Sequence, residues 1–168
     1  MGLFDRHLPS GTGERYALLA ERALAVADKA GPWRELFDTA HALFSVLATK
    51  ADIGVQIKAA YDADDRTALD KLANEVMPEL LWRVEKFHRC LQAQWMAENK
   101  PHGFEVQDQR LGGLLLRLKS VARRLNGYLA GQVNAIPELE EDRLPYIGDA
   151  ESHTRCNHWA STISPGYV

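Results

Sequence analysis

Cysteine is scarce in this chain of 168 residues, which contains two thiols, Cys90 and Cys156. Two cysteines are too few for a disulfide scaffold, and neither lies in the spacing that zinc-binding motifs use. We therefore expect no metal site and no other cofactor. Unpaired thiols persist in a reducing compartment, so the composition predicts a cytoplasmic location.

Blocks of one charge and long apolar runs are also missing. The formal net charge is -3, and acidic and basic residues are interspersed. Without a basic patch, the electrostatic signature of a nucleic-acid-binding protein is absent. No segment reaches the roughly 20 apolar residues that a membrane-spanning helix needs, and residues 1–11 lack the apolar core of a secretory signal. Neither nucleic acid nor a membrane is a predicted partner.

Sustained alternation of apolar and polar residues, the mark of half-buried strands, is not found either. Apolar residues instead recur at steps of three and four, which is the period of a helix with one buried face. This pattern predicts main helices at about 13–30, 33–62, 66–98 and 107–130. A short fifth helix is predicted at 137–143, followed by an irregular C-terminal tail from Pro145. We expect one all-α domain, residues 1–168, folded as a helical bundle.

Several details of these helices follow from single residues. Ser10 or Thr12 can cap the first helix. Pro78 lies inside the third helix and removes one backbone hydrogen bond, so a kink or break is expected near Met77. Gly54 lies on the buried face of the second helix, where it either permits a close helix contact or breaks the helix. The predicted buried stripe of the first helix consists of Tyr16, Leu19, Ala23, Val26 and Ala27.

Recognisable catalytic motifs are absent. The chain has no P-loop, no dinucleotide-binding glycine pattern, no nucleophile elbow and no zinc-protease motif. Acidic residues do cluster at Glu138, Glu140, Glu141 and Asp142. Glycosidases need two carboxyl groups on opposite sides of a sugar. Four acids in one short helix fit a solvated surface better, so we predict no catalytic residue.

The stretch ENKPHGFEVQDQRLGG, residues 98–113, concentrates charged, aromatic and glycine residues between two predicted helices. One interpretation is a loop that contacts a ligand or a partner, because loops on rigid scaffolds often carry function. Its candidate residues are Asn99, Lys100, His102, Phe104, Glu105, Asp108 and Arg110. In the alternative interpretation these residues only shape the turn, with Asp108 favouring the start of a helix. Gly112 and Gly113 are predicted to allow close helix packing.

Two further hypotheses start from side-chain type. A small enzyme could use Glu105, Asp108 and His102, although helical bundles with catalytic sites usually carry repeats such as Glu-x-x-His, and none is evident here. Tryptophans can stack on sugars, and Trp82 and Trp159 lie outside the predicted apolar stripes.

The runs ENKPHGFEVQDQRLGGLLLRL and YLAGQVNAIPELEEDRL resemble the helical C-terminal domain of bacterial family 20 glycoside hydrolases, which are exo-β-N-acetylhexosaminidases. Two further runs resemble the same domain, the upstream LFDTAHALFSVLATKADIGVQIKAAY and the final NHWASTISPGYV. The resemblance therefore spans nearly the whole chain. His102 departs from the pattern, since an aromatic or aliphatic residue is more usual there.

The resemblance implies a role without catalysis in this chain. In those enzymes a TIM barrel precedes the helical domain, and an adjacent Asp-Glu pair of the barrel acts with the acetamido group of the substrate. That pair has no counterpart here. The resemblance therefore implies an accessory and assembly domain that supports a TIM-barrel catalytic domain or a homodimer and contributes to a partner's sugar site. The alternative is a free-standing module that binds amino sugars or a protein partner through the loop from Asn99 to Arg110.

Overall fold

The computed structural model describes residues 8–141, and all regular structure in that range is helical. The prediction of an all-α bundle with four main helices is confirmed. The predicted tail from Pro145 and the last residues of the short helix lie outside the described range. The elements are α1 (Thr12–Ala27), the 3-10 turn η2 (Gly31–Trp33), α2 (Arg34–Asp62), α3 (Arg66–Lys71), the π-helical turn η3 (Leu72–Val76), α4 (Met77–Glu98), α5 (Glu105–Leu129) and α6 (Pro137–Glu140).

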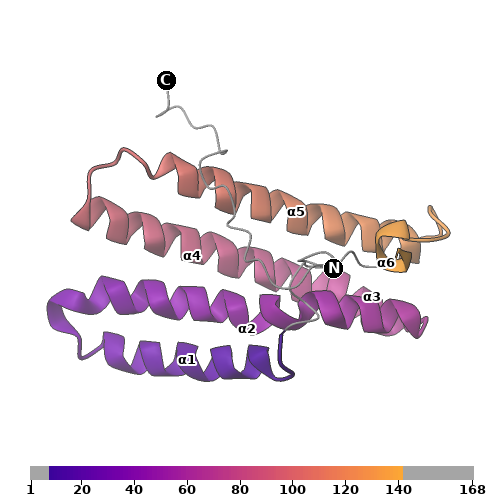
Figure 1. The fold of residues 1–168 in the computed structure, drawn as a ribbon, viewed down its shortest axis with the longest axis horizontal. Coiled ribbons are helices and arrows are strands. Elements are labelled where there is room, and N and C mark those ends of the chain that lie inside the picture. Colours follow the sequence, from indigo (N-terminus) through magenta and orange to yellow (C-terminus); the bar gives the residue numbers. More distant parts are fainter. Residues whose placement is uncertain (1–7, 142–168) are drawn as a thin grey trace, which may run out of the picture.

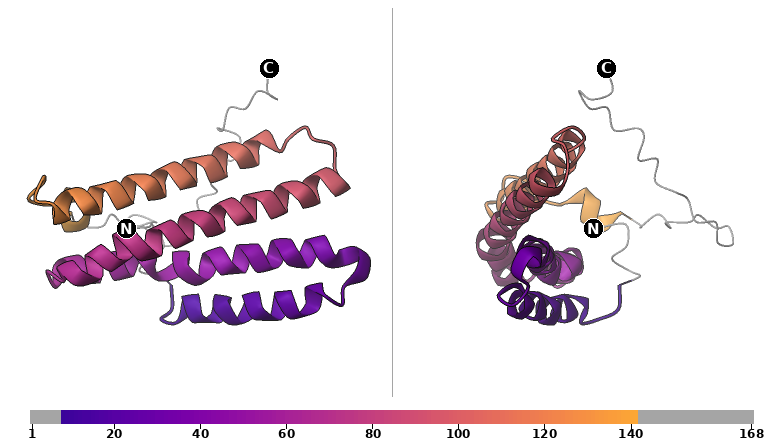
Figure 2. Two further views of the ribbon diagram at one scale, coloured as in Figure 1. Left: turned by 180° about the vertical axis from the view of Figure 1, so that it is seen from behind. Right: turned by 90° about the vertical axis from the view of Figure 1, so that its left-hand side faces the viewer.

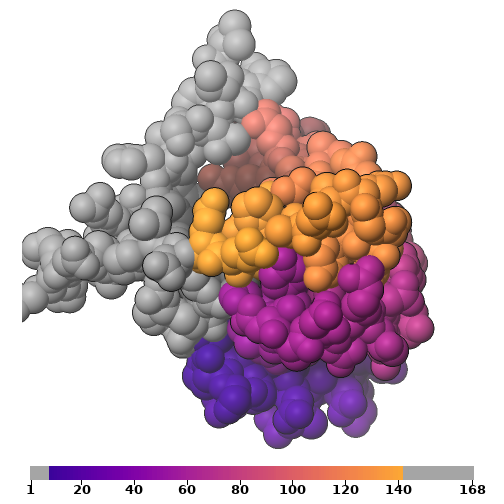
Figure 3. Space-filling model, turned by 90° about the vertical axis from the view of Figure 1, so that its right-hand side faces the viewer, coloured from indigo at the N-terminus to yellow at the C-terminus, as the bar shows by residue number. Residues whose placement is uncertain are grey.

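The long helices lie side by side in the order α1, α2, α4, α5 (Figure 1). Short connections make neighbouring helices antiparallel. Seen from one end, the row is curved and α6 lies on its concave side (Figure 2). The end of α5, α6 and the turn between α2 and α3 meet at one end of the molecule (Figure 3). There the Arg66 guanidinium donates a hydrogen bond to the Leu129 carbonyl oxygen at 2.7 Å.

The core lies where α2, α3, α4 and α5 face one another. Burial of each large apolar side chain contributes roughly 1.5–3 kcal/mol relative to leaving it in water. The central helix pair α3–α4 supplies the side chains with the lowest exposure. The core residues include Val46, Ile53, Ile57, Leu69, Leu72, Met77, Leu80, Val84, Leu118 and Leu125.

Helix α1 packs on α2 through its small residues, which are Gly13, Ala20, Ala23 and Ala27. The predicted placement of Leu19 and Val26 in the buried stripe is wrong, because their exposed fractions are 38% and 43%. A Cβ atom at Gly13 would lie 2.5 Å from the Ala48 carbonyl oxygen. The backbones are therefore so close that larger side chains are directed to the sides of the contact.

The start of α1 is not capped by Ser10 or Thr12. The N-cap residue is Gly11, which makes no side-chain hydrogen bond, and the Thr12 hydroxyl donates to the Pro9 carbonyl oxygen at 2.6 Å. The Gly13 amide instead donates to Asp52 Oδ2 at 3.0 Å. The cap is thus supplied by a side chain of α2, 39 residues further along the chain.

The irregularity expected near Met77 is the π-helical turn η3, which joins α3 to α4 in one helical run. The Met77 amide donates to the carbonyl oxygen of Leu72, five residues earlier, rather than to the residue four earlier. Pro78 then lies in the first turn of α4, where a missing backbone N–H leaves no bond unmade. Helix α2, by contrast, continues through Gly54 without a break.

Candidate functional site

The motif that was predicted to bind a ligand or a partner covers the connection between α4 and α5 and the first turns of α5. Phe104, its central residue, is 2% exposed. Its ring centroid lies 5.6 Å from that of His88 and 5.8 Å from that of Trp95, both on α4. The Trp95 indole N–H donates to the Lys100 carbonyl oxygen at 2.9 Å. Aromatic packing on α4 therefore fixes this loop, and Phe104 belongs to the core rather than to an exposed contact surface.

Glu105 and Asp108, two acidic residues of the motif, also have partners within the chain. Glu105 Oε2 accepts a hydrogen bond from the Gly103 amide at 2.7 Å. Gly103 has φ of 99°, a left-handed conformation that favours glycine. Asp108 Oδ1 lies 2.6 Å from His88 Nε2, so this pair joins α5 to α4. The structural interpretation of the motif accounts for Phe104, Glu105 and Asp108.

His88 is the member of this cluster that sequence reasoning missed. It lies on α4, 20 residues before Asp108. A usable signal was its position seven residues before Trp95, since residues seven apart share one face of a helix.

The exposed residues of the motif are those at the tip of the connection. Asn99, Lys100 and His102 have solvent-exposed side chains, while Arg110 is half-buried on α5. Met96, one turn earlier on α4, is also exposed. The structure thus divides the predicted site residues into an internal group that holds the turn and an external group that is accessible to another molecule.

Gly112 and Gly113, which are predicted to allow close helix packing, make no close contact with another described helix. Apart from the neighbouring backbone of α5 itself, no atom of the described residues lies within 4 Å of a Cβ placed at either glycine. Both belong to the side of α5 that faces away from the core, as does Leu116, which is 64% exposed. Gly13, which the sequence pattern did not single out, does approach another helix closely.

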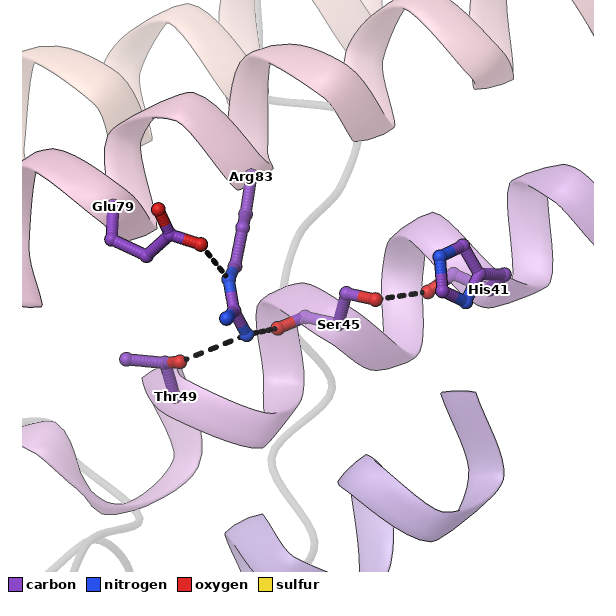
Figure 4. A network of polar contacts seen from close by, with 5 residues as sticks. All are labelled: His41, Ser45, Thr49, Glu79 and Arg83. Atoms are coloured by element: carbon purple, nitrogen blue, oxygen red, sulfur yellow. Dashed lines mark hydrogen bonds and ion pairs between the residues drawn. The ribbon is translucent and has the colours of Figure 1, made fainter. Parts of the chain in front are cut away.

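A polar network joins α2 to α4 on another side of the molecule (Figure 4). Arg83 Nε lies 2.9 Å from Glu79 Oε1, and Arg83 Nη1 donates to the Ser45 carbonyl oxygen at 2.9 Å and to Thr49 Oγ1 at 3.3 Å. His41 Nδ1 lies 3.0 Å from the Ala20 carbonyl oxygen, an acceptor, so this nitrogen donates. His41 and Arg83 therefore connect α2 to α1 and to α4, respectively.

A small cavity of about 150 Å³ lies beside this network. Trp82, at its edge, is 51% exposed, and the Lys86 ammonium lies 5.5 Å from the centroid of the indole ring. The cavity has no residue of the 99–110 loop in its lining. Its lining residues are His41, Ala42, Ser45, Glu79, Trp82, Arg83 and Lys86.

A larger groove of about 360 Å³ lies between α2 and α5 and ends at α6. Its lining is mainly apolar. Lys50, Arg117 and Arg124 add positive charge, and Arg124 pairs with Glu138 at 3.2 Å. The apolar lining includes Ile53, Ile57, Met77, Leu118, Leu125 and Leu139.

The acidic cluster of α6 is solvated, as predicted, for Glu138, Glu140 and Glu141; Asp142 lies outside the described residues. A backbone hydrogen bond at Glu138, together with Arg124, lowers the pKa of that carboxyl. Glu140 accepts a hydrogen bond from the Tyr61 hydroxyl at 2.6 Å, and this bond raises the pKa of Tyr61. These carboxylates fasten α6 to the bundle and do not face each other across a pocket.

The remaining chemical groups give no further site within residues 8–141. No group of three or more potential metal-ligating side chains is found in that range. Cys90 is half-buried, and desolvation raises the pKa of its thiol, which disfavours the reactive thiolate. None of the helices in the described range combines the length and apolarity that would carry it across a bilayer.

Comparison with known proteins identifies the chain at the level of the family. No curated protein sequence gives a significant match. The family model described as the Glycoside Hydrolase 20C C-terminal domain matches residues 1–158, which is nearly the whole chain and includes all described elements. The helical bundle with the α4–α5 connection described above therefore belongs to the family of glycoside hydrolase 20C C-terminal domains.

Proposed function

We propose that this chain is a non-catalytic accessory and assembly domain that docks on a TIM-barrel catalytic domain or on a second copy of itself in the cytoplasm. Membership in the family of C-terminal domains, across residues 1–158, is the observation that carries this proposal. The internal use of Glu105 and Asp108 supports it further, since both carboxylates already bind groups of the same chain.

The outward side of α5 and the tip of the α4–α5 connection form the docking surface in this proposal. Gly112 and Gly113 leave the helix backbone open, which lets another backbone approach closely. Leu116 supplies an apolar side chain beside them. Lys100 and His102 lie at the same end of the helix pair and can pair with acidic or polar groups of the partner.

The test uses the full chain with a β-N-acetylhexosaminidase barrel that lacks its own helical domain. We expect self-association in light scattering, or a complex with the barrel in analytical ultracentrifugation. Leu116→Asp should weaken that association roughly tenfold or more, because it places a charge in an apolar contact. Leu18→Asp is the matched control, since Leu18 is an exposed leucine on α1.

Two results would overturn the proposal. One is a chain that remains monomeric and does not bind the barrel. The other is robust turnover of a chromogenic N-acetylglucosaminide by the isolated chain, which would contradict the non-catalytic role.

A second candidate function is the binding of an amino sugar, and Trp82 is the observation that favours it. An indole that is half exposed beside a polar cavity can stack on the apolar face of a pyranose, while Glu79 and Arg83 bind hydroxyl groups. Titration calorimetry with N-acetylglucosamine, on the wild type, Trp82→Ala and Lys100→Ala, separates this cavity from the loop. The absence of heat with the wild type would remove this candidate.

A further inference from the structure

The groove between α2 and α5 lies on the concave side of the bundle. In the part of the chain that the structure describes, this groove is open on one side. Helices α2 and α5 lie on opposite sides of α4 (Figure 2). The groove between α2 and α5 is lined by apolar side chains, including Met77 of α4. Its volume of about 360 Å³ exceeds the ~30 Å³ of one water molecule roughly tenfold. Exposing the apolar lining of this groove to water costs free energy. An apolar segment that covers the lining would therefore stabilise the fold.

The chain leaves the described structure at the edge of this groove. Ile136 and Leu139 form its end wall, and the described range stops at Glu141. This end of the chain is held in place: the Tyr61 hydroxyl donates to Glu140 and accepts from the Ile136 amide at 3.0 Å. Arg124 adds an ion pair with Glu138. The residues after Glu141 therefore begin at a fixed point beside the groove.

Those residues have the composition that the groove requires. The segment 142–151, DRLPYIGDAE, contains three large apolar residues, Leu144, Tyr146 and Ile147. It has three acidic residues and one arginine, so its formal charge is 1 - 3 = -2. The groove supplies positive charge through Lys50 and Arg117. Because the family match extends to residue 158, the segment belongs to the same domain as the bundle.

We propose that residues 144–147 dock in this groove and complete the core between α2 and α5. Three residues of extended chain span about 10 Å, which brings Leu144 from the end of α6 to the groove. Pro145 favours an extended backbone at Leu144, the conformation that such a return needs. In this arrangement the apolar side chains of the segment cover Ile57 and Leu118, and its acidic residues face Lys50 and Arg117.

The experiment places a nitroxide label in the segment and measures its distance to the groove. The full chain carries Cys90→Ala, Cys156→Ala and Ile147→Cys, with the label on the new thiol. We expect strong paramagnetic broadening of the methyl signals of Ile53, Ile57 and Leu118. The Met96 methyl is the internal reference, because 19 residues of helix place it about 28 Å from Met77 along α4.

A pair of substitutions on α2 then tests whether the groove itself holds the segment. Gly54 lines the groove, so Gly54→Phe fills it and should abolish the broadening. Val55→Phe is the matched control, since Val55 is exposed, and it should leave the broadening unchanged. Trypsin cleavage after Arg143 should become roughly tenfold faster in Gly54→Phe than in Val55→Phe, because cleavage follows the population of the released segment.

Three outcomes would overturn the proposal. The first is the absence of broadening at the groove methyl groups. The second is broadening at these groups from a label at Leu3→Cys and not from one at Ile147→Cys, which would assign the groove to the N-terminal segment. The third is broadening that appears only when label and isotope are on different molecules, which would assign the groove to a second copy.

Discussion

The amide of Gly13 and the carboxylate of Asp52 join the first turn of α1 to the middle of α2 at 3.0 Å. Where a helix usually begins with a local capping side chain, this one uses an acceptor from the neighbouring helix. The contact requires glycine, because a Cβ at position 13 would lie 2.6 Å from Asp52 Oδ2 and 2.5 Å from the Ala48 carbonyl oxygen. One residue therefore sets both the start of α1 and its distance from α2.

Gly13→Ala should lower the free energy of unfolding by about 1–3 kcal/mol, since the added methyl group must displace backbone atoms. Asp52→Ala should cost about 1 kcal/mol, because it removes the acceptor and leaves the backbone contact in place. Urea unfolding followed by circular dichroism measures both. Equal stability of Gly13→Ala and the wild type would contradict the close contact between the helices.

Gly113→Ala should raise the free energy of unfolding, in contrast to Gly13→Ala. Outside the neighbouring backbone of α5, a methyl group at this position meets no described atom within 4 Å, and alanine favours a helix interior by about 1 kcal/mol over glycine. We expect a gain of about 0.5–1 kcal/mol in stability for the isolated chain, with a similar gain for Gly112→Ala. If α5 docks as proposed, the same changes should weaken association, which separates the two effects in one pair of variants. A loss of stability would show that the outward side of α5 is covered within the chain.

Phe104→Ala should be among the most damaging single changes in the α4–α5 connection. The side chain is 2% exposed and contacts the rings of His88 and Trp95, so its removal leaves a cavity. A cost of about 3–5 kcal/mol is typical for a buried phenylalanine. Lys100→Ala, an exposed change in the same connection, is the control and should stay within about 0.5 kcal/mol of the wild type. A small effect of Phe104→Ala would instead favour a role in ligand contact.

Tyr61→Phe tests how α6 is attached. It removes the hydrogen bond to Glu140 and the one from the Ile136 amide, so we expect a loss of about 0.5–1 kcal/mol at neutral pH. The bond to Glu140 raises the pKa of Tyr61 in the folded chain. Its contribution is therefore fully present below the pKa of the unfolded chain, near 10, and is lost as the pH rises through the folded value.

Unfolding at pH 8 and at pH 11 checks this dependence. The difference in stability between the wild type and Tyr61→Phe should be largest at pH 8 and should shrink or reverse at pH 11. A difference that stays constant across this range would show that folding does not shift the pKa of the Tyr61 hydroxyl.

The sequence predicts the fold well where helices bury wide apolar stripes. Leu69, Leu72, Leu80 and Val84 recur at helical spacing, and all four are buried. Helix α1 could not be oriented in this way, since it contacts α2 through glycine and alanine, residues that a hydrophobic pattern ranks low. The close approach of the α1 and α2 backbones involves Asp52, 39 residues after Gly13. The residues next to Gly13 in the sequence therefore do not predict it.

The candidate site shows a different limit. The motif at 98–113 was identified as unusual, and the structure explains part of it as internal hydrogen bonds and aromatic packing. Residue type did not show that Phe104 points inward or that Asp108 pairs with His88, because both depend on how α4 and α5 face each other. The prediction for Gly112 and Gly113 stays a prediction for the same reason, since spacing alone does not tell which side of a helix is covered.

The curved row of helices has a consequence for cooperativity. Helix α1 makes its extensive contacts with α2, at one edge of the row, whereas α2 and α4 are enclosed on two sides. An edge helix can detach without exposing the centre of the core, so we expect α1 to open locally as a separate unit. Its amide hydrogens should exchange with solvent deuterium at a lower free energy than those of α4, and alterations in α1 should be tolerated without global unfolding.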